Sequence, residues 1–410
     1  MRKLLAIAVL CACATFSATA TNSLQQLAEL TPTTRANQDS FGISVAISGD
    51  TAVVSDYDAN IESFGSIYVY VKPASGWDNM TQTARLTASD SGQGFGTSVA
   101  IDGNIIVVGA ANTSNFSRAT ATPGAVYVYV KPAGGWQDMT ETAKLTATDG
   151  LSGDAFGNSV SISGTTIAIG AFFVNNFSGR AYVFTHNGGG WKQAAELTAS
   201  DSDGILDYLG CSVAISGDTV VAGSFGHTNF QGASYVFVEP SGGWSNMTET
   251  AELSASNGAQ SDNLGFSVGI NGSVIVAGAP GARSSFGGAY VYLQPTGGWS
   301  TTSSFAAELG APNGLSGDSF GQAVSIGHSG RVIVVGAPGL NVGSNDEEGA
   351  AYVYSEPKAG WGKVRSTVEL TASDGTSLIF FGVSVGISNS SIIAGAPGDT
   401  APGAAYIFGP

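Results

Sequence analysis

The chain has 410 residues, of which 43% are hydrophobic and 11% are charged, and its formal net charge is −16. These apolar residues suffice for a sizeable core, whereas the acidic balance without a lysine or arginine cluster argues against nucleic acid or an anionic membrane as partner. Glycine, at 58 residues, is about twice as frequent as usual, which favours many short strands and tight turns over long surface helices.

The N-terminus has the features of a secretory signal peptide. Arg2 and Lys3 form a short positive segment, an apolar run covers residues 4–14, and residues 18–20 fit a small-x-small cleavage site. The apolar run is shorter than the about 20 residues that span a bilayer. We therefore expect a signal peptide at 1–20 and an extracellular, secreted protein without a transmembrane segment, periplasmic or at the cell surface in a bacterium. An uncleaved anchor and a lipoprotein are the alternatives.

A unit of about 55 residues then recurs seven times. Each copy opens on Phe-Gly or Leu-Gly, continues through an apolar run and a short polar turn, and reaches a second run, which in five copies ends at a Gly-Ala corner. A third run of the Tyr-Val-Tyr-Val type follows, then a tryptophan and a fourth run ending in leucine, both missing from the last copy. The copies begin near residues 41, 95, 156, 209, 264, 320 and 381.

Each unit predicts four short antiparallel strands, because β-branched and aromatic residues dominate the runs and glycine turns separate them. One such sheet leaves both faces open, whereas a ring of sheets covers them. The last unit stops after its third strand, at Phe408, and Leu27–Thr31 matches the missing fourth strand. The sequence therefore predicts an all-β, seven-bladed β-propeller of four-stranded blades over residues 21–410, closed by the N-terminal strand.

The Phe-Gly … Gly-Ala-Pro pattern resembles FG-GAP repeats, the units of the integrin alpha-chain propeller, over about residues 24–410. The resemblance implies a ligand-binding platform on one face of the ring. Integrin-type repeats often carry an Asp-x-Asp-x-Asp-Gly calcium loop between the first two strands. Here that hairpin has about two residues in every unit and carries no series of aspartates, as at 48–51 and 163–166. Calcium at that site is therefore not implied, and the units resemble the short, calcium-less repeats of exported proteins.

Acidic residues recur where one unit joins the next. Asp149 and Asp201 follow a Leu-Thr-Ala frame, and Asp154 and Asp318 precede the Phe-Gly or Leu-Gly pair. Carboxylates at these positions could hold a hard cation such as calcium. Their recurrence favours the alternative that they bond to their own backbone and shape the turn. We expect no cofactor, with these four aspartates as the candidates if a metal binds.

The loops after the second strands vary most and are expected to form the ligand-binding face. Candidate contact residues there are Phe116, Phe172, Phe177, His227 and Asp346. The tryptophans, one in each of the first six units, could stack on sugar rings. An aromatic residue that occurs once per blade more often fills the gap between sheets.

Catalysis has little support in the sequence. Our motif search finds no HExxH, GxSxG, P-loop or CxxC motif, and we expect no catalytic residue. Three histidines stand at unrelated positions of the repeat. If any of them were catalytic, His227, in a loop after a second strand, would be the best candidate. Cys211 occupies a position that varies from unit to unit, so we interpret it as a near-core residue and not a reactive thiol.

Asn-x-Ser/Thr sequons would be glycosylation sites if the source is eukaryotic. They lie at Asn79, Asn112, Asn115, Asn176, Asn246, Asn271 and Asn389. Asn79 and Asn246 follow the tryptophan at the same point of the unit and are the best candidates.

These observations predict a secreted or cell-surface, non-enzymatic interaction or adhesion protein that binds an extracellular protein through the loops of a propeller. A carbohydrate-binding, lectin-like propeller is the alternative, and it would need exposed aromatic rings on one face. A secreted hydrolase or lyase is a further alternative, and it would need clustered carboxylates and a histidine near the central channel.

Overall fold

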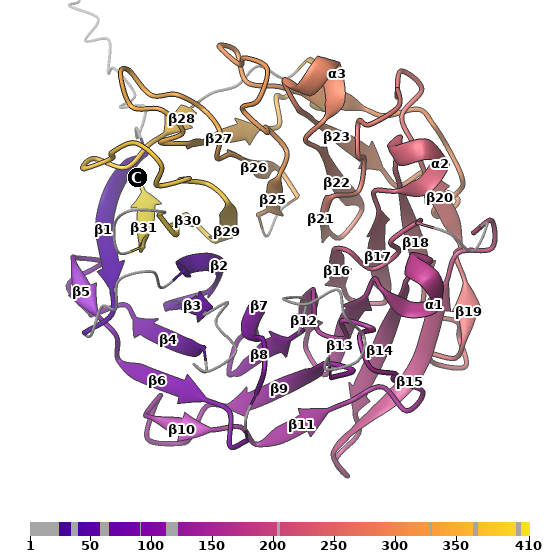
Figure 1. Ribbon diagram of the computed structural model, residues 1–410, viewed down its shortest axis with the longest axis horizontal. Coiled ribbons are helices and arrows are strands. Elements are labelled where there is room, and N and C mark those ends of the chain that lie inside the picture. Colours follow the sequence, from indigo (N-terminus) through magenta and orange to yellow (C-terminus); the bar gives the residue numbers. More distant parts are fainter. Residues whose placement is uncertain are drawn as a thin grey trace, which may run out of the picture.

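The computed structural model describes residues 24–33, 40–57, 65–90, 92–111, 122–202, 206–327, 330–363, 368–398 and 403–410. Seven sheets stand around a ring, each with four antiparallel strands (Figure 1). The predicted all-β, seven-bladed propeller is confirmed. The predicted signal peptide, together with Phe116, Asn112 and Asn115, lies outside the described residues.

In blades one to six, the four main strands run from the centre of the ring to its rim in chain order, and blade seven takes its outer strand from the N-terminal end (Figure 1). The innermost strands are β2 (Ser40–Ser48), β7 (Phe95–Asp102), β12 (Val160–Ser163), β16 (Val213–Ser216), β21 (Ser267–Asn271), β25 (Ala323–Ile326) and β29 (Ser384–Ser388). The second strands are β3 (Thr51–Tyr57), β8 (Ile105–Ala110), β13 (Thr166–Ala171), β17 (Thr219–Ser224), β22 (Val274–Ala279), β26 (Val332–Ala337) and β30 (Ser391–Ala396).

The third strands are β4 (Ser66–Val71), β9 (Ala125–Val130), β14 (Arg180–His186), β18 (Ala233–Val238), β23 (Gly288–Leu293), β27 (Ala350–Ser355) and β31 (Ala404–Gly409). The outer strands of blades one to six are β6 (Ala84–Thr87), β11 (Ala143–Leu145), β15 (Trp191–Thr198), β20 (Ala251–Leu253), β24 (Ala307–Leu309) and β28 (Val368–Leu370). The outer strand of blade seven is β1 (Gln25–Thr31).

The N-terminal strand closes the ring as predicted. Strand β1 pairs antiparallel with β31, with Glu29 opposite Tyr406 and Leu30 opposite Ala405. Leu30 is fully buried, so this pairing also completes the apolar contact between blade seven and blade one. The two ends of the described chain therefore share one sheet.

The apolar core lies between neighbouring blades. Second and third strands such as β17 and β18 are buried along almost their whole length, because another sheet covers each of their faces. One cluster, for example, joins Val183 and Leu197 of blade three to Val220 and Tyr235 of blade four. Burial between sheets is the main apolar contribution to the stability of the ring.

The glycines of the repeat let two blades approach closely. A Cβ atom at Gly278, near the end of β22, would overlap the carbonyl oxygen of Gly321 in the Phe-Gly pair of the next blade. The same approach joins Gly395 of blade seven to Gly42 of blade one. The Gly-Ala corner of one unit therefore docks on the Phe-Gly pair of the next, which explains why both glycines recur.

Three short strands cross between blades and were not predicted. They are β5 (Met80–Thr81), β10 (Met139–Thr140) and β19 (Met247–Thr248). Each lies between the third and outer strands of its own blade and pairs in parallel with the outer strand of the preceding blade, as Met247 does with Leu197. We call these segments the rim straps.

The hairpins between first and second strands have two residues in six blades, as predicted. In blade six the prediction is wrong, because five residues separate Ile326 from Val332.

The helical elements of the described chain are single turns: α1 (Val174–Phe177), α2 (His227–Phe230), α3 (Ala282–Ser285) and η1 (Trp361–Lys363). Across the described residues, no helix is both long and apolar enough to cross a membrane.

Candidate functional site on the loop face

Two sets of loops emerge on one face of the ring, which we call the loop face. Each loop after a second strand ends beside the segment that opens the next blade, as the parallel bridges Gly179–Leu209 and Gly232–Leu264 show. In blade three, the backbone N–H of Tyr208 donates to the carbonyl of Phe177 at 2.7 Å. Loops of neighbouring blades therefore form a continuous surface.

Aromatic side chains gather on this face where blades three, four and five meet. They come from the loops that hold α1 and α2, from the segment entering blade four, and from the start of blade five (Figure 1). We define the aromatic patch as Phe172, Phe173, Phe177, Tyr208, Phe225, Phe230 and Phe266.

The rings of the patch contact one another directly. Tyr208 stacks on Phe225 with ring centroids 4.6 Å apart and an angle of 9° between the rings. Phe177 lies 5.7 Å from Tyr208, and Phe266 lies 5.7 Å from Phe225. Phe266 is 39% exposed, Phe173 is buried, and the other five are half-buried. The patch is a partly exposed apolar surface, which in a globular protein commonly marks a binding site.

The patch contains two of the predicted contact residues, Phe172 and Phe177. His227 lies beside it at the start of α2, whereas Asp346 lies in blade six, in the loop between β26 and β27. Asp346 therefore lies outside the patch, and its backbone N–H donates to Ser377 Oγ at 3.1 Å.

Sequence reasoning missed Tyr208, Phe225 and Phe266 because none recurs from unit to unit. One signal was available. Phe172 and Phe225 stand where later units carry the proline of Gly-Ala-Pro, so two neighbouring units share the same departure from the repeat. This departure places a phenylalanine at the corner in both blades.

The four aspartates that were candidates for a metal lie at three blade junctions, with Asp149 and Asp154 in the same segment before blade three. Asp149 accepts the hydroxyl of Tyr182 and pairs with Arg180, and Asp201 accepts the hydroxyl of Tyr235 at 2.9 Å. The same bond from a third-strand tyrosine occurs in blades two, six and seven. It ties each blade to the segment by which the chain enters it.

Asp154 and Asp318 bond to the backbone of their own turns. Asp154 Oδ2 accepts the N–H of Leu151 at 2.7 Å, and Asp318 accepts the N–H of Leu315 in the same way. Both side chains are nearly buried, and burial raises the pKa of the Asp318 carboxyl although the bond from Leu315 opposes the shift. This is the backbone bonding that a turn-shaping role requires.

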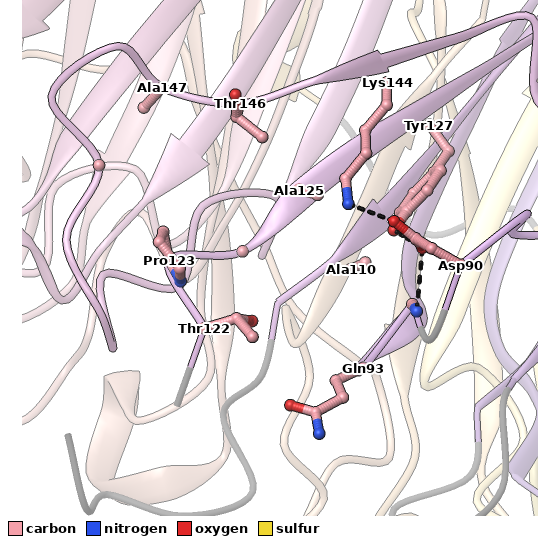
Figure 2. Close-up of a pocket in the computed structure, with 13 residues that line it drawn as sticks. Asp90, Gln93, Ala110, Thr122, Pro123, Ala125, Tyr127, Lys144, Thr146 and Ala147 are labelled. Atoms are coloured by element: carbon pink, nitrogen blue, oxygen red, sulfur yellow. Dashed lines mark hydrogen bonds and ion pairs between the residues drawn. The ribbon is translucent and has the colours of Figure 1, made fainter. Parts of the chain in front are cut away.

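A pocket of about 400 Å³ opens between the segments that enter blades two and three (Figure 2). Asp90, Gln93 and Thr122 line it together with Tyr127 and Lys144. Partial burial disfavours the Asp90 carboxylate, but hydrogen bonds from Lys144 and Tyr127 outweigh this effect and lower its pKa. The pocket therefore holds a fixed ion pair beside several hydroxyl and amide groups.

The tryptophans do not form an exposed set. Trp77, Trp136, Trp299 and Trp361 are buried in the clusters between blades, and Trp244 packs against such a cluster. Trp191 differs in position, because it begins strand β15. The aromatic rings available to a ligand are those of the aromatic patch instead.

Three GxSxG-type segments correct our motif search, which found none: residues 265–269, 317–321 and 382–386. Ser267 of the first and Ser384 of the third lie in inner strands and donate to backbone carbonyls of the next blade, which leaves the segment Gly317–Gly321. Its Ser319 has a positive φ of 57°, as a nucleophile at a strained turn can have. The residues at the same point of other blades share this conformation, for example Ala155 at 59° and Asn263 at 59°. The conformation thus belongs to the repeat, and Ser319 Oγ donates to the carbonyl of Gly317 at 3.3 Å.

The two best glycosylation candidates have a structural role. The side-chain Oδ1 of Asn79 accepts the backbone N–H of Glu29 at 2.8 Å, and that of Asn246 accepts the N–H of Glu196 at 2.9 Å. Both asparagines are exposed and stand at the start of a rim strap. Use of these sequons stays a prediction.

Solved structures share this architecture at low sequence identity. A protein from Bacteroides uniformis described as a candidate 6-phosphogluconolactonase has a TM-score of 0.52 and 13% identity, with 82% of this chain and 86% of that chain covered. At this identity the likeness concerns the fold alone. No curated protein matches the chain.

The model of the FG-GAP repeat matches seven segments, residues 24–70, 80–129, 139–184, 191–237, 247–292, 304–354 and 364–408. Each match begins near an outer strand or its rim strap and ends in the third strand of a blade, so the first runs from β1 to β4. The glycine of the corner contacts the Phe-Gly or Leu-Gly pair of the next blade in six of the seven copies, and Ser55 takes its place in blade one. The family model matches all seven copies, so the chain belongs to the FG-GAP repeat family.

Proposed function

We propose that the protein is an exported, non-enzymatic binding protein that holds an extracellular protein ligand on its aromatic patch. The observation that carries this proposal is the contiguous set of rings from Phe172 to Phe266, which stays partly exposed although most other aromatic residues that the structure describes are buried. Phenylalanine and tyrosine are enriched at the centres of protein interfaces. Export is supported by the predicted signal peptide at 1–20.

The rigid ring favours binding through this surface. The patch is built from loops of three blades whose backbones are bonded together, so the rings are ordered before a ligand arrives. A preordered surface loses less side-chain and loop entropy on binding than a flexible one. FG-GAP repeats also form the integrin alpha-chain propeller, which binds ligands through its loops.

Photo-crosslinking from the patch tests the proposal. A benzoyl-phenylalanine at position 266 is expected to capture a discrete extracellular protein, and an excess of unmodified protein should compete it away. The same probe at Leu315, which is 61% exposed in another loop, serves as the matched control. Phe266→Ser should weaken binding of the captured protein about tenfold or more, whereas Leu315→Ser should not. Equal capture from both positions would contradict the proposal.

A carbohydrate ligand is the second candidate, and the pocket beside Asp90 and Lys144 favours it. A volume of about 400 Å³ with a fixed ion pair and the Thr122 and Gln93 side chains suits the hydroxyl groups of one or two sugar rings. Binding to a glycan array that is lost in Lys144→Ala and kept in Phe266→Ser would favour this candidate over the protein ligand. The lactonase activity named for the structural neighbour is not proposed, because the likeness is one of fold.

A further inference from the structure

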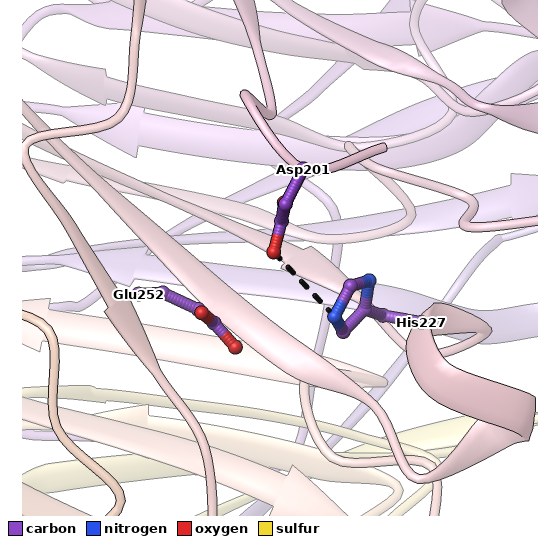
Figure 3. A group of neighbouring side chains, drawn as sticks. All are labelled: Asp201, His227 and Glu252. Carbon is purple, nitrogen blue, oxygen red and sulfur yellow. Dashed lines mark ion pairs between the residues drawn. The ribbon is translucent and has the colours of Figure 1, made fainter. Parts of the chain in front are cut away.

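Blade four contains a histidine that faces two carboxylates. His227 begins α2, Asp201 lies in the segment that enters the blade, and Glu252 lies on the outer strand β20 (Figure 3). One ligand atom from each residue lies within 4.8 Å of the others, and among the residues that the structure describes this is the one such group of three. The Nε2 atom of His227 lies 3.6 Å from Asp201 Oδ2.

A third carboxylate, that of Asp207, holds the other nitrogen of the histidine ring. The Nδ1 atom of His227 lies 3.3 Å from Oδ1 of Asp207, whose side chain is 6% exposed. Asp207 is itself held, since its Oδ2 accepts the hydroxyl of Ser202 at 2.6 Å. A carboxylate that accepts the Nδ1–H of histidine leaves the Nε2 lone pair for a metal, and metal-bound histidines usually donate their other N–H to such a carboxylate, a backbone carbonyl or water.

The sister blades place a permanent cation at the corresponding position. In blade three, Arg180 bonds to both Asp149 and Glu196, which correspond to Asp201 and Glu252. In blade five, Arg283 lies 3.9 Å from Glu308, and Asn257 replaces the aspartate. Blade four alone of these three has no arginine between the two acidic positions, and a neutral imidazole leaves the carboxylates uncompensated.

We propose that Asp201, His227 and Glu252 bind a divalent transition metal of the zinc class, with Asp207 orienting the histidine. One imidazole nitrogen and two carboxylate oxygens are a known ligand set for zinc, and the three donors need to approach to about 3.4 Å from one another around bonds of about 2.1 Å. The pair His227–Asp201 is already close to this separation. Calcium fits less well, because it prefers six to eight oxygen ligands. Asp201 is 40% exposed, so water can complete the coordination.

This site is independent of the proposed ligand, so its test can fail without affecting the binding function. The full chain is stripped with a chelator and titrated with ZnCl₂ or CaCl₂ while metal content and the thermal midpoint are measured. We expect about one zinc per chain and a raised midpoint with zinc, and no comparable effect with calcium. Failure of zinc to bind or to raise the midpoint would overturn the proposal.

Three variants make the test specific. His227→Arg supplies the fixed cation that blades three and five carry, so it should fold normally without metal and lose the response to zinc. Asp207→Asn should weaken zinc binding about 10- to 100-fold, as removal of an orienting carboxylate does. His186→Gln is the matched control, because His186 stands beside Trp191 on blade three and should leave zinc binding unchanged. Zinc binding that persists in His227→Arg, or that is lost in His186→Gln, would contradict the assigned ligands.

Discussion

At the scale of single residues, glycine sets how closely the blades approach. The Gly278 Cα faces the Gly321 carbonyl of the next blade, and Ser267 Oγ donates to that same carbonyl at 2.8 Å. The carbonyl is therefore both packed and hydrogen-bonded, and neither partner can move away without breaking other contacts. A side chain at position 278 would force the two sheets apart.

Gly278→Ala should therefore lower the free energy of unfolding by about 3 kcal/mol, at the upper end of the cost of overpacking a core. Gly297→Ala is the matched control, because a Cβ at Gly297 meets no atom within 4 Å. Denaturant unfolding of the two variants measures the difference. A Gly278→Ala protein as stable as the control would mean that the blades can separate at little cost.

The buried carboxyl of Asp318 should make the stability of the protein depend on pH. Burial raises its folded-state pKa above the value in the unfolded chain, so the folded state holds the proton more tightly. This contribution to stability is present below the ordinary aspartate pKa, about 4, and is lost as the pH rises through the folded-state pKa. Asp318→Asn removes this titration. The free energy of unfolding should therefore fall less in the variant as the pH rises through the folded-state pKa of Asp318. Denaturant midpoints at a series of pH values measure it, with Asp218→Asn, in an exposed turn, as the control.

Cys211 should be unreactive in the folded protein. Burial raises the pKa of its thiol to about 11, and Sγ lies 3.3 Å from the carbonyl oxygen of Gly265. The thiolate that attacks thiol reagents is therefore scarce at pH 8. Labelling with a chromogenic disulfide should be slow in the native state and fast in denaturant, and fast labelling of the native protein would contradict this interpretation.

At the scale of elements, the rim straps protect the outer edges of the sheets. Strap β19 pairs with β15, and side chains on either side of it bond to the β15 edge. Asn246 accepts the N–H of Glu196, and Glu249 accepts the N–H of Ser200 at 2.9 Å. An outer strand covered in this way offers fewer free backbone groups to another chain.

Asn246→Ala should cost about 1 kcal/mol, because it leaves the N–H of Glu196 without its acceptor. Hydrogen exchange should speed up in β15 while β23, two blades away, keeps its protection. Ser245→Ala, at the exposed neighbouring position, is the control. Unchanged exchange in β15 would show that the strap contributes nothing to the edge.

At the scale of the whole molecule, stability depends on closure. The seventh sheet takes its outer strand from the other end of the chain, and this strand also buries Leu30 against blade one. Without β1, the Tyr406 edge of β31 would be exposed and the ring could open between blades seven and one.

A chain that begins after Thr33 should lose about 3 kcal/mol or more of stability, the contribution of a buried leucine and its neighbours, and should self-associate. A synthetic peptide of residues 24–33 added in trans should restore the thermal midpoint and the monomer. The control is a chain that begins at Thr21. If the shortened chain unfolds at the same midpoint as the control, closure by β1 is not what holds the ring together.

The sequence allowed prediction of the ring because its signals repeat. Seven copies of one pattern fixed the number of blades, and the match of Leu27–Thr31 to the missing fourth strand revealed closure. The rim straps could not be predicted from the sequence, because each pairs through only two residues, as Met80 and Thr81 do, and its partner strand lies in another unit. Tyr208, Phe225 and Phe266 of the aromatic patch could not be predicted because they do not recur. The grouping of Asp201, His227 and Glu252 could not be predicted because His227 has no counterpart in the other units and meets the two recurring acidic positions only after folding.

The offset between the family unit and the sheet bears on how such proteins change in number of repeats. Because the first matched unit spans β1 to β4, it donates one outer strand to the sheet before it and three strands to its own. Duplication or loss of one whole unit in the gene would therefore add or remove one complete junction between sheets, and every strand would still have a strand to pair with. A single genetic event could thus give a ring with one sheet more or one sheet fewer, without passing through a protein that has an incomplete sheet.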